Sequence, residues 1–433
     1  MSVTARQNLS TLTTDELAAE RDRLADEHAE LAARGLSLNL ARGRPSTAQV
    51  DLADELLALP GRGAGVGPDG TDYRNYYGGL QGLAGLRELF APVLGVPADQ
   101  LIAEGNSSLA LMYQCVVEAL LHGVPGGPGP WRDVERVAFI AAVPGYDRHF
   151  AICQELGIEL LSVPMTDAGP DVDAVRELVA DPRVKGMWCV PTYSNPTGVT
   201  YAEDVVQALA GMPTGAPDFR LWWDNAYAVH HLTEFETPSS DILAITAAAG
   251  HPDRAFVFGS TSKITTAGAG VAFLGSSTAN VDWYLRHMRF RTIGPDKLNQ
   301  LRHLRFLGDL DGVRAHMAKH RELIAPKFAL VDRVLREELA GTAAAEWSTP
   351  KGGYFINVDV LGGCAARVVE LAGKAGIALA PAGASFPYGH DPADRNFRIA
   401  ATYPPLEELD AAMHGLTLCV RLAEAEQRLP SHD

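Results

Sequence analysis

The feature that most constrains the fold is an alternation, between about residues 80 and 290, of short apolar runs with segments of helical length. The apolar runs include RVAFIAAV, KGMWCVP, RLWWDNAY and RAFVFGS, which are rich in β-branched and aromatic residues. Short runs of this kind are typical of strands in a mostly parallel sheet that is buried between helices. We therefore expect an α/β fold.

The remainder of the chain predicts a second, smaller domain. From about residue 310, long helical segments precede alternating strands and helices around KGGYFINVDV and NFRIAATYP, a pattern typical of an α+β domain. Near the start, Thr13 and Glu16 have the spacing of a capping box, so we expect a helix over residues 14–33. The expected divisions are an N-terminal helix and segment, residues 1–55, that pack with the small domain; a large domain, 56–310; and the small domain, 311–433.

Composition argues against several functions. The chain has 37 Lys+Arg against 53 Asp+Glu, a formal net charge of −16, so neither a nucleic acid nor a membrane is an expected partner. The N-terminal segment lacks the apolar core of a secretory signal, and the five scattered cysteines fit a reducing cytoplasm. No metal site is expected, because neither Cys nor His residues stand at ligand spacing. The adjacent His230 and His231 have no partner at zinc spacing and are expected to be structural or to support site residues without contacting the ligand.

Ligands of open α/β sheets bind outside the carboxyl ends of the strands, so the residues after each apolar run are candidates for a site. Lys263 follows the run FVFGS in a turn of small residues, beside Ser260 and Ser262. A lysine amine near apolar surroundings has a lowered pKa and can form a Schiff base, while the two hydroxyls could hold a phosphate. The alternative is a lysine in a surface loop.

Two further junctions carry a carboxylate and an amide. Asp224 ends the run RLWWD, with Tyr227 three residues later, and a carboxylate there needs a cationic partner such as a protonated pyridine nitrogen, unless it forms an Asx turn. Asn195 lies in SNPTG, where a plain turn is the alternative. Asn195, Asp224 and Lys263 are separated by 29 and 39 residues. Each gap suits a crossover connection, so all three can converge on one side of the sheet.

The last two junctions could hold an anion and a flat ring. Gly105, Asn106, Ser107 and Ser108 precede the helical segment LALMYQCVVEALL, and the free amides of a helix N-terminus suit a phosphate. A plain N-cap would use the same serines. Tyr146 follows RVAFIAAV and offers an aromatic face, with a core tyrosine as the alternative.

Taken in this order, the motifs resemble the fold-type-I PLP-dependent aminotransferases over nearly the whole chain. The segments LNLARGRPS, YGGLQGLAGLRELF and GPDKLNQLRHLRF resemble most the bacterial subgroup Ic of aspartate aminotransferases. The resemblance implies a mostly parallel, seven-stranded-type sheet in a large domain that binds pyridoxal 5'-phosphate (PLP), together with a smaller α+β domain. It also implies a homodimer with shared active sites.

The resemblance further implies a role for each residue of the site. Lys263 would form the internal aldimine with PLP, and Asp224 would pair with the pyridine nitrogen. Tyr227 would be the third catalytic residue. Tyr227 and Asn195 would hydrogen-bond the ring oxygen, and Tyr146 would stack on the ring. The phosphate contacts would come from Asn106, Ser107, Ser108, Ser260, Ser262 and, for the neighbouring subunit, Tyr77.

For the substrate, the resemblance implies that Arg398 in NFRIAATYP binds the α-carboxylate. A planar guanidinium suits this task because it can hold a carboxylate through two parallel hydrogen bonds. Gly43 would line the substrate pocket, where close backbone approach favours a missing side chain. Arg291 and Arg289 are nearest the family's position for a distal carboxylate, with Arg44 as a third choice.

The sequence departs from the family pattern at one place. Many members carry an arginine as phosphate counter-charge at a position that Gly270 or Val271 occupies here. That contact is therefore excluded, and Thr265, Thr266 or another arginine must compensate.

The implied reaction moves an amino group between aspartate or glutamate and a 2-oxo acid such as 2-oxoglutarate, by a ping-pong aldimine/ketimine mechanism. A β-lyase or decarboxylase on the same fold stays open, because function depends on the site. A PLP-sensing regulator is disfavoured, because about 35 residues precede LNLARGRPS, too few for a winged-helix head. A dinucleotide-dependent dehydrogenase is excluded, because Gly268-Ala269-Gly270 lacks the third glycine of G-x-G-x-x-G.

Overall fold

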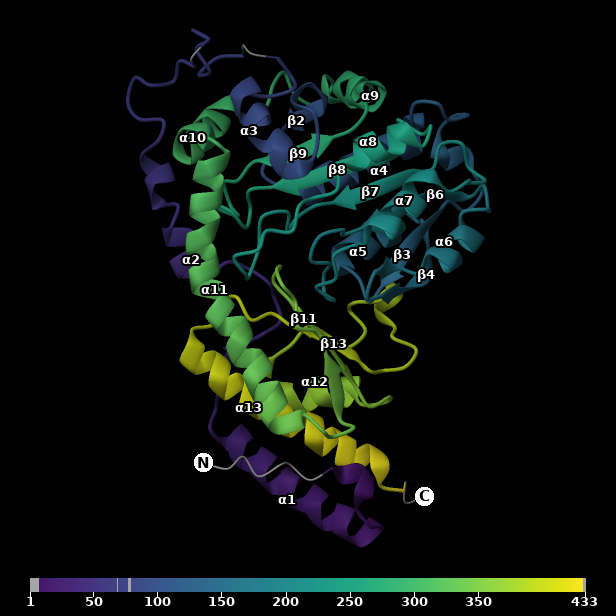
Figure 1. Cartoon of the computed structure of the whole chain (residues 1–433), viewed down its shortest axis with the longest axis vertical. Helices are drawn as coiled ribbons and strands as arrows, with labels where there is room; N and C mark the ends of the chain where they lie inside the picture. The colour runs from purple at the N-terminus through teal and green to yellow at the C-terminus, as the bar shows by residue number, and fades with distance from the viewer. Residues whose placement is uncertain (1–7, 68, 77–78, 431–433) are drawn as a thin grey trace.

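The computed structural model describes residues 8–67, 69–76 and 79–430. A large domain built on one sheet lies above a smaller domain in Figure 1, and the long helix α11 (Leu310–Leu339) runs from one to the other. In the described part of the chain, none of the helices combines the length and the apolar character needed to cross a membrane.

The sheet of the large domain has the strand order β2-β9-β8-β7-β6-β3-β4-β5. The neighbours from β8 to β4 pair in parallel, whereas β9 pairs antiparallel with both β2 and β8. The expected mostly parallel sheet is confirmed, with an eighth strand because two-residue β5 pairs with the edge. The strands are β2 (Leu101–Ala103), β3 (Ala138–Val143), β4 (Glu159–Thr166), β5 (Gly169–Pro170), β6 (Val184–Cys189), β7 (Arg220–Asp224), β8 (Ala255–Ser260) and β9 (Ala272–Gly275).

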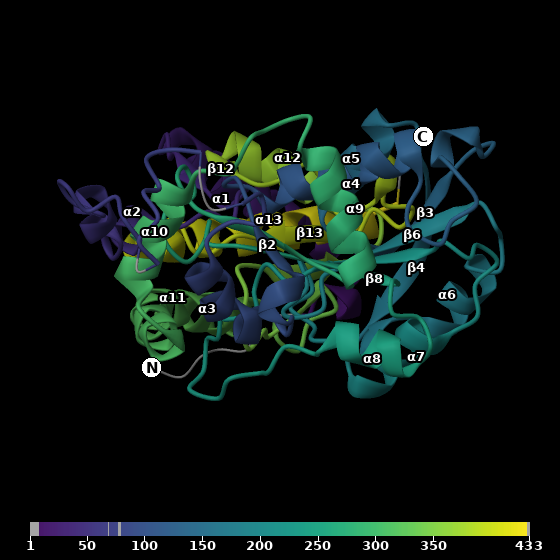
Figure 2. The same cartoon turned by 90° about the horizontal axis from the view of Figure 1, so that it is seen from above.

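Helices cover both faces of this sheet, as Figure 2 shows from above. Alternate residues of β8 serve the two faces: Ala255 and Val257 belong to one apolar core, while Phe256 and Phe258 belong to the other. Since both faces are buried, the central strands are continuous apolar runs. The helices are α3 (Ala84–Leu94), α6 (Val172–Leu178), α7 (Glu203–Gly211), α8 (Ile242–Ala248) and α10 (Lys297–Leu307) with the first core, and α4 (Ser108–His122), α5 (Asp147–Glu155) and α9 (Thr278–Met288) with the second.

The small domain packs helices on a three-stranded antiparallel sheet, β10 (Ala345–Trp347), β11 (Ile356–Val360) and β13 (Asn396–Ile399). Helix α1 (Thr14–Ala33) lies against α13 (Leu406–Arg428), as Figure 1 shows. The expected capping box is confirmed, because Thr13 and Glu16 exchange backbone-to-side-chain hydrogen bonds of 2.9 and 3.4 Å. The other elements are α2 (Thr47–Asp51), α12 (Ala365–Lys374), the parallel pair β1 (Leu38–Asn39) and β12 (Ile377–Ala378), and five 3-10 turns, η1 (Leu9–Thr11), η2 (Asp54–Ala58), η3 (Ala98–Gln100), η4 (Trp131–Asp133) and η5 (Pro387–Gly389).

Candidate active site

A cavity lies where the carboxyl ends of β6, β7 and β8 meet the N-terminus of α4. The fold brings together here six side chains from five separate stretches of sequence, because parallel strands all end at the same edge of the sheet. The lining residues predicted from the sequence are Ser108, Tyr146, Asn195, Asp224, Tyr227 and Lys263, and they are joined by Leu109, Met112, Val190 and Ala226.

Lys263 lies in the turn after β8, with its amine among aromatic rings. Its Nζ is 4.9 Å from the ring centre of Tyr227 and 6.0 Å from that of Tyr354. Burial lowers the pKa of the amine below the ordinary lysine value, an effect that the negative charge of Asp224 partly offsets. A larger fraction of the amine is therefore neutral near pH 7, the form that acts as nucleophile and base.

The backbone of Lys263 is fixed by buried side chains: His230, expected to be structural or supporting, and Tyr354 and His316, which the sequence analysis did not assign to the site. The Lys263 carbonyl accepts hydrogen bonds from His230 Nε2 at 3.2 Å and from the Tyr354 hydroxyl at 3.4 Å, and His316 Nε2 donates to the next carbonyl, of Ile264, at 2.7 Å. Burial, followed by the charge of Lys263, lowers the pKa of His230 to about 3, so this imidazole is neutral. These contacts hold the turn that carries the lysine.

One oxygen of the Asp224 carboxylate is paired and the other is not. His149 Nε2 lies 3.0 Å from Oδ2, both side chains are buried, and the His149 ring stacks on Trp188 with centroids 4.4 Å apart. The buried Oδ1 finds no hydrogen-bond partner within the described residues. An unpaired buried carboxylate oxygen is costly, and the protonated nitrogen of a pyridine ring would satisfy it. The site thus fits the ring of PLP.

The two tyrosines of the cavity are protonated phenols. Burial raises the pKa of Tyr146 and of Tyr227 above the ordinary value, so both hydroxyls can donate hydrogen bonds near neutral pH. Tyr146 precedes α5 and meets the ring of His149 edge to face, with centroids 4.9 Å apart. The Tyr146 ring and the Asp224 carboxylate line the same cavity, so a flat ring bound there could meet both.

Arg398, on β13 of the small domain, reaches across to the large domain. Its Nη1 donates to Asp147 Oδ1 at 3.1 Å and to Asn195 Oδ1 at 3.3 Å, and its guanidinium lies 4.9 Å from the ring centre of Phe355. The buried Nε has no hydrogen-bond partner in the part of the chain that the structure describes. A Cβ at Gly43 would overlap the ring of Phe355. Glycine at position 43 therefore keeps the neighbourhood of this arginine open.

The serines expected at a phosphate gather at the N-terminus of α4. Ser107 is the N-cap, with its Oγ 3.3 Å from the amide of Ala110. Ser262 Oγ donates to the Asn106 carbonyl at 3.2 Å, and the Ser262 amide donates to Ser260 Oγ at 3.4 Å. Two loops thus place three hydroxyls and a helix N-terminus side by side, an arrangement suited to an anion.

Gly270 stands at a position where many family members carry the phosphate-binding arginine, and the structure leaves little room for a side chain there. A Cβ at Gly270 would lie 2.9 Å from Thr261 Oγ1 and 3.0 Å from the Thr266 carbonyl. Thr265, one of the expected substitutes, directs its hydroxyl into the protein, 3.2 Å from the Thr261 carbonyl and 3.0 Å from His303 Nε2. The Thr265 hydroxyl therefore has partners of its own.

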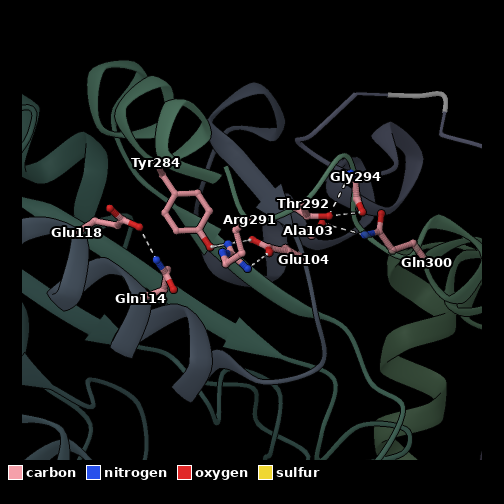
Figure 3. Close-up of polar contacts among 9 residues, drawn as sticks. All are labelled: Ala103, Glu104, Gln114, Glu118, Tyr284, Arg291, Thr292, Gly294 and Gln300. Carbon is pink, nitrogen blue, oxygen red and sulfur yellow. Dashed lines mark hydrogen bonds and ion pairs between the residues drawn. The ribbon is translucent and has the colours of Figure 1, made fainter. Parts of the chain in front are cut away.

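Arg291 is engaged by a carboxylate that the sequence analysis missed. Its Nη1 and Nη2 lie 2.5 and 3.1 Å from the two oxygens of buried Glu104, and the Tyr284 hydroxyl donates to the same carboxylate at 2.7 Å (Figure 3). Burial acts to lower the pKa of Arg291, but the hydrogen bonds and charges of Glu104 and Tyr284 together outweigh it, and the pKa is raised. Within one chain, binding of a substrate by Arg291 would require breaking this pair, a physical reason against that expectation.

The other residues that the sequence suggested for the distal carboxylate and for the subunit contact are Arg289, Arg44 and Tyr77. Arg289 caps the C-terminus of α9 and is exposed. The Arg44 guanidinium lies 3.6 Å from the ring centre of Tyr403, next to Gly43. Tyr77, expected to reach a neighbouring subunit, lies outside the described residues.

The chain is similar to known proteins over almost its whole length. A model of the aspartate amino-transferase family matches residues 12–432. An aminotransferase of Mycolicibacterium smegmatis is 54% identical over 98% of this chain and 99% of its own length, and an aspartate aminotransferase of Corynebacterium glutamicum is 52% identical over 92% of each chain. The crystal structure of an aspartate transaminase from C. glutamicum, 49% identical, covers 97% of this chain and 99% of its own with a TM-score of 0.95.

Proposed function

The chain belongs to the aspartate aminotransferase family, and we propose from this premise that it transfers the amino group of aspartate or glutamate to a 2-oxo acid such as 2-oxoglutarate. It is an aminotransferase of the fold-type-I class. The observation that carries the proposal is the cavity in which the Lys263 amine and the unpaired Oδ1 of Asp224 lie together. A nucleophilic amine and a buried anion are what a PLP-dependent transfer requires of the protein.

The family implies PLP as cofactor, and the residues of the cavity fit it. When bound, PLP supplies an electron sink for charge that develops at the substrate Cα. Asp224, with Oδ2 held by His149, keeps a proton on the pyridine nitrogen. Tyr227 and Asn195 donate to the ring oxygen, and Tyr146 covers the ring. Asn106, Ser107, Ser108, Ser260 and Ser262 hold the phosphate.

Lys263 moves the proton of the reaction. Burial keeps part of the amine neutral at physiological pH, so Nζ can accept the proton from the substrate Cα and later return it to a neighbouring carbon. The hydrogen bonds of His230 and Tyr354 to the Lys263 carbonyl fix the starting point of the side chain. One amine then serves both transfers, which is compatible with ping-pong kinetics.

The substrate carboxylates are assigned to arginines of the small domain and its neighbouring segment. Arg398 binds the α-carboxylate with help from Asn195, beside Gly43. Because Glu104 holds Arg291, we favour Arg44 for the distal carboxylate within one chain. We further propose a homodimer in which Tyr77 reaches the phosphate of the neighbouring subunit.

A screen of amino acids with the PLP-loaded enzyme and 2-oxoglutarate tests the proposal. Aspartate should give oxaloacetate with stoichiometric glutamate, and the half-reaction without 2-oxoglutarate should stop after one turnover. Steady release of ammonia or CO2 without a 2-oxo acid would instead indicate a β-lyase or a decarboxylase. Turnover of only monocarboxylic amino acids would refute the dicarboxylate assignment while leaving the transfer reaction intact.

A further inference from the structure

We propose that Glu118, His122 and His287 form a binding site for a first-row transition-metal ion, with zinc as the best match. Glu118 and His122 are one turn apart on α4, and His287 lies in the last turn of α9. The phosphate-binding serines stand at the other end of α4, about 20 Å away at 1.5 Å per residue. The ion would therefore occupy a site separate from the reaction.

The possible ligand atoms of the three side chains lie near one another. Glu118 Oε2 lies 3.6 Å from His122 Nε2 and 3.6 Å from His287 Nδ1, and the ligand atoms of all three lie within 4.8 Å of one another. Ligand atoms around a tetrahedral zinc ion, with bonds of about 2.0–2.1 Å, are about 3.3 Å apart. The carboxylate is thus within a few tenths of an ångström of the required distance to each imidazole.

The donor set matches the chemistry of zinc. Two imidazoles and one carboxylate are the protein ligands of known zinc sites that keep one position for water, whereas calcium and magnesium prefer oxygen ligands alone. The His122 side chain is 50% exposed, so water can reach the fourth position. The Gln114 amide donates to Oε1 of Glu118, as Figure 3 shows, and leaves Oε2 for the ion.

The surroundings of Glu118 leave its charge without a permanent partner. Its side chain is only 13% exposed, and neither lysine nor arginine lies within ion-pair distance of it among the residues that the structure describes. The rings of His122 and His287 stack with centroids 4.5 Å apart and an angle of 11° between their planes, so one ring has to turn for both nitrogens to point at the ion, and the half-exposed His122 has room to do so. A divalent cation bound here would place positive charge beside this largely buried carboxylate.

The bound ion would join the last turns of α4 and α9. Both helices pack on the same face of the sheet, where they share an apolar core. The metal would add a polar connection between them. Sequence spacing alone does not indicate the site, because the third ligand comes from a helix far along the chain. A ligand that binds only the folded chain stabilises it.

Zinc titration of the metal-free PLP enzyme, followed by calorimetry and by the thermal unfolding midpoint, tests the site. We expect one zinc ion per chain with a dissociation constant in the micromolar range or below, and a rise in the unfolding midpoint. H287Q and E118Q should each weaken zinc binding at least about tenfold. Both variants keep side-chain size and are checked for unchanged cofactor absorbance before titration.

H414Q is the matched control. His414 is a half-exposed imidazole whose Nδ1 lies 3.6 Å from Glu338 and whose Nε2 lies 3.8 Å from Asp410, so its two contacts face different carboxylates and share no ion position. H414Q should bind zinc like the wild type. The proposal is overturned if the wild type takes up no zinc at about 1 mM, a concentration that would detect even weak binding. It is also overturned if H287Q and E118Q both bind zinc as tightly as the wild type and H414Q.

Discussion

His149 holds one oxygen of the Asp224 carboxylate at 3.0 Å and leaves the other oxygen, Oδ1, buried without a partner among the described residues. The imidazole fixes the orientation of the carboxylate, because its ring is stacked on Trp188. A rigid buried anion with one free oxygen is prepared for a single cationic hydrogen-bond donor.

Asp224→Asn should retain PLP but lower kcat of the half-reaction by about a hundredfold or more, since a neutral amide cannot hold the proton on the pyridine nitrogen. Stopped-flow measurement of the half-reaction with aspartate, together with the cofactor content, tests this. His149→Gln should give a smaller loss, about tenfold, because it removes only the support of the carboxylate. Half-reaction rates of Asp224→Asn within threefold of wild type would contradict the assigned role.

Lys263→Ala should lose the visible absorbance of the covalently held cofactor and reduce turnover by about 10⁴-fold or more, because nucleophile and proton carrier are removed together. Spectra of the purified variant and a coupled assay measure the two effects. The exposed loop residue Lys351 provides the control, because Lys351→Ala leaves the amine of Lys263 in place. Retention of both absorbance and turnover by Lys263→Ala would refute the assignment.

Arg398→Lys should lower kcat/KM for aspartate by about tenfold to a hundredfold, because an ammonium group cannot grip a carboxylate through two parallel hydrogen bonds. Steady-state kinetics at fixed 2-oxoglutarate measure the change. Arg395→Lys, at an exposed position just before the same strand, should stay near wild type. Equal kinetics for the two variants would remove Arg398 from the substrate site.

Stability should fall as the pH is lowered from about 6.5, and buried His230 should contribute. Its pKa is about 3 in the folded chain against an ordinary value of 6.5, so the unfolded chain takes up the proton first and is favoured by acid. Between pH 6.5 and 4.5 this group alone costs about 2–3 kcal/mol of the free energy of unfolding. Thermal unfolding midpoints at the two pH values should therefore differ less in His230→Gln than in wild type.

The control for this effect is His390→Gln, which replaces an exposed histidine. It should lose as much stability on acidification as the wild type. A parallel loss in His230→Gln as well would mean that His230 does not titrate as its burial implies.

The sequence predicted the parts of the site that depend on strand ends. Asn195, Asp224 and Lys263 follow successive parallel strands, so their convergence could be argued from chain spacing alone. The family resemblance and the α/β fold are likewise confirmed.

The supporting contacts could not be predicted in this way. His149 reaches Asp224 from a helix after a different strand, and Tyr354 reaches Lys263 from the small domain. Arg291 could be named as a basic residue near the family's position, but its partner Glu104 lies 187 residues earlier. Such pairs depend on how helices and domains pack, which local sequence patterns do not encode.

The contact of Arg398 with Asp147 has a consequence for affinity. The two residues belong to different domains, and their ion pair of 3.1 Å is one of the ties between them. If Arg398 binds the substrate as proposed, the substrate carboxylate must share the guanidinium with Asp147 or displace Asp147 from it. The affinity that is measured is then a difference between two carboxylates that compete for one arginine, and a stronger pair of Arg398 with Asp147 would weaken the binding of every carboxylate substrate alike.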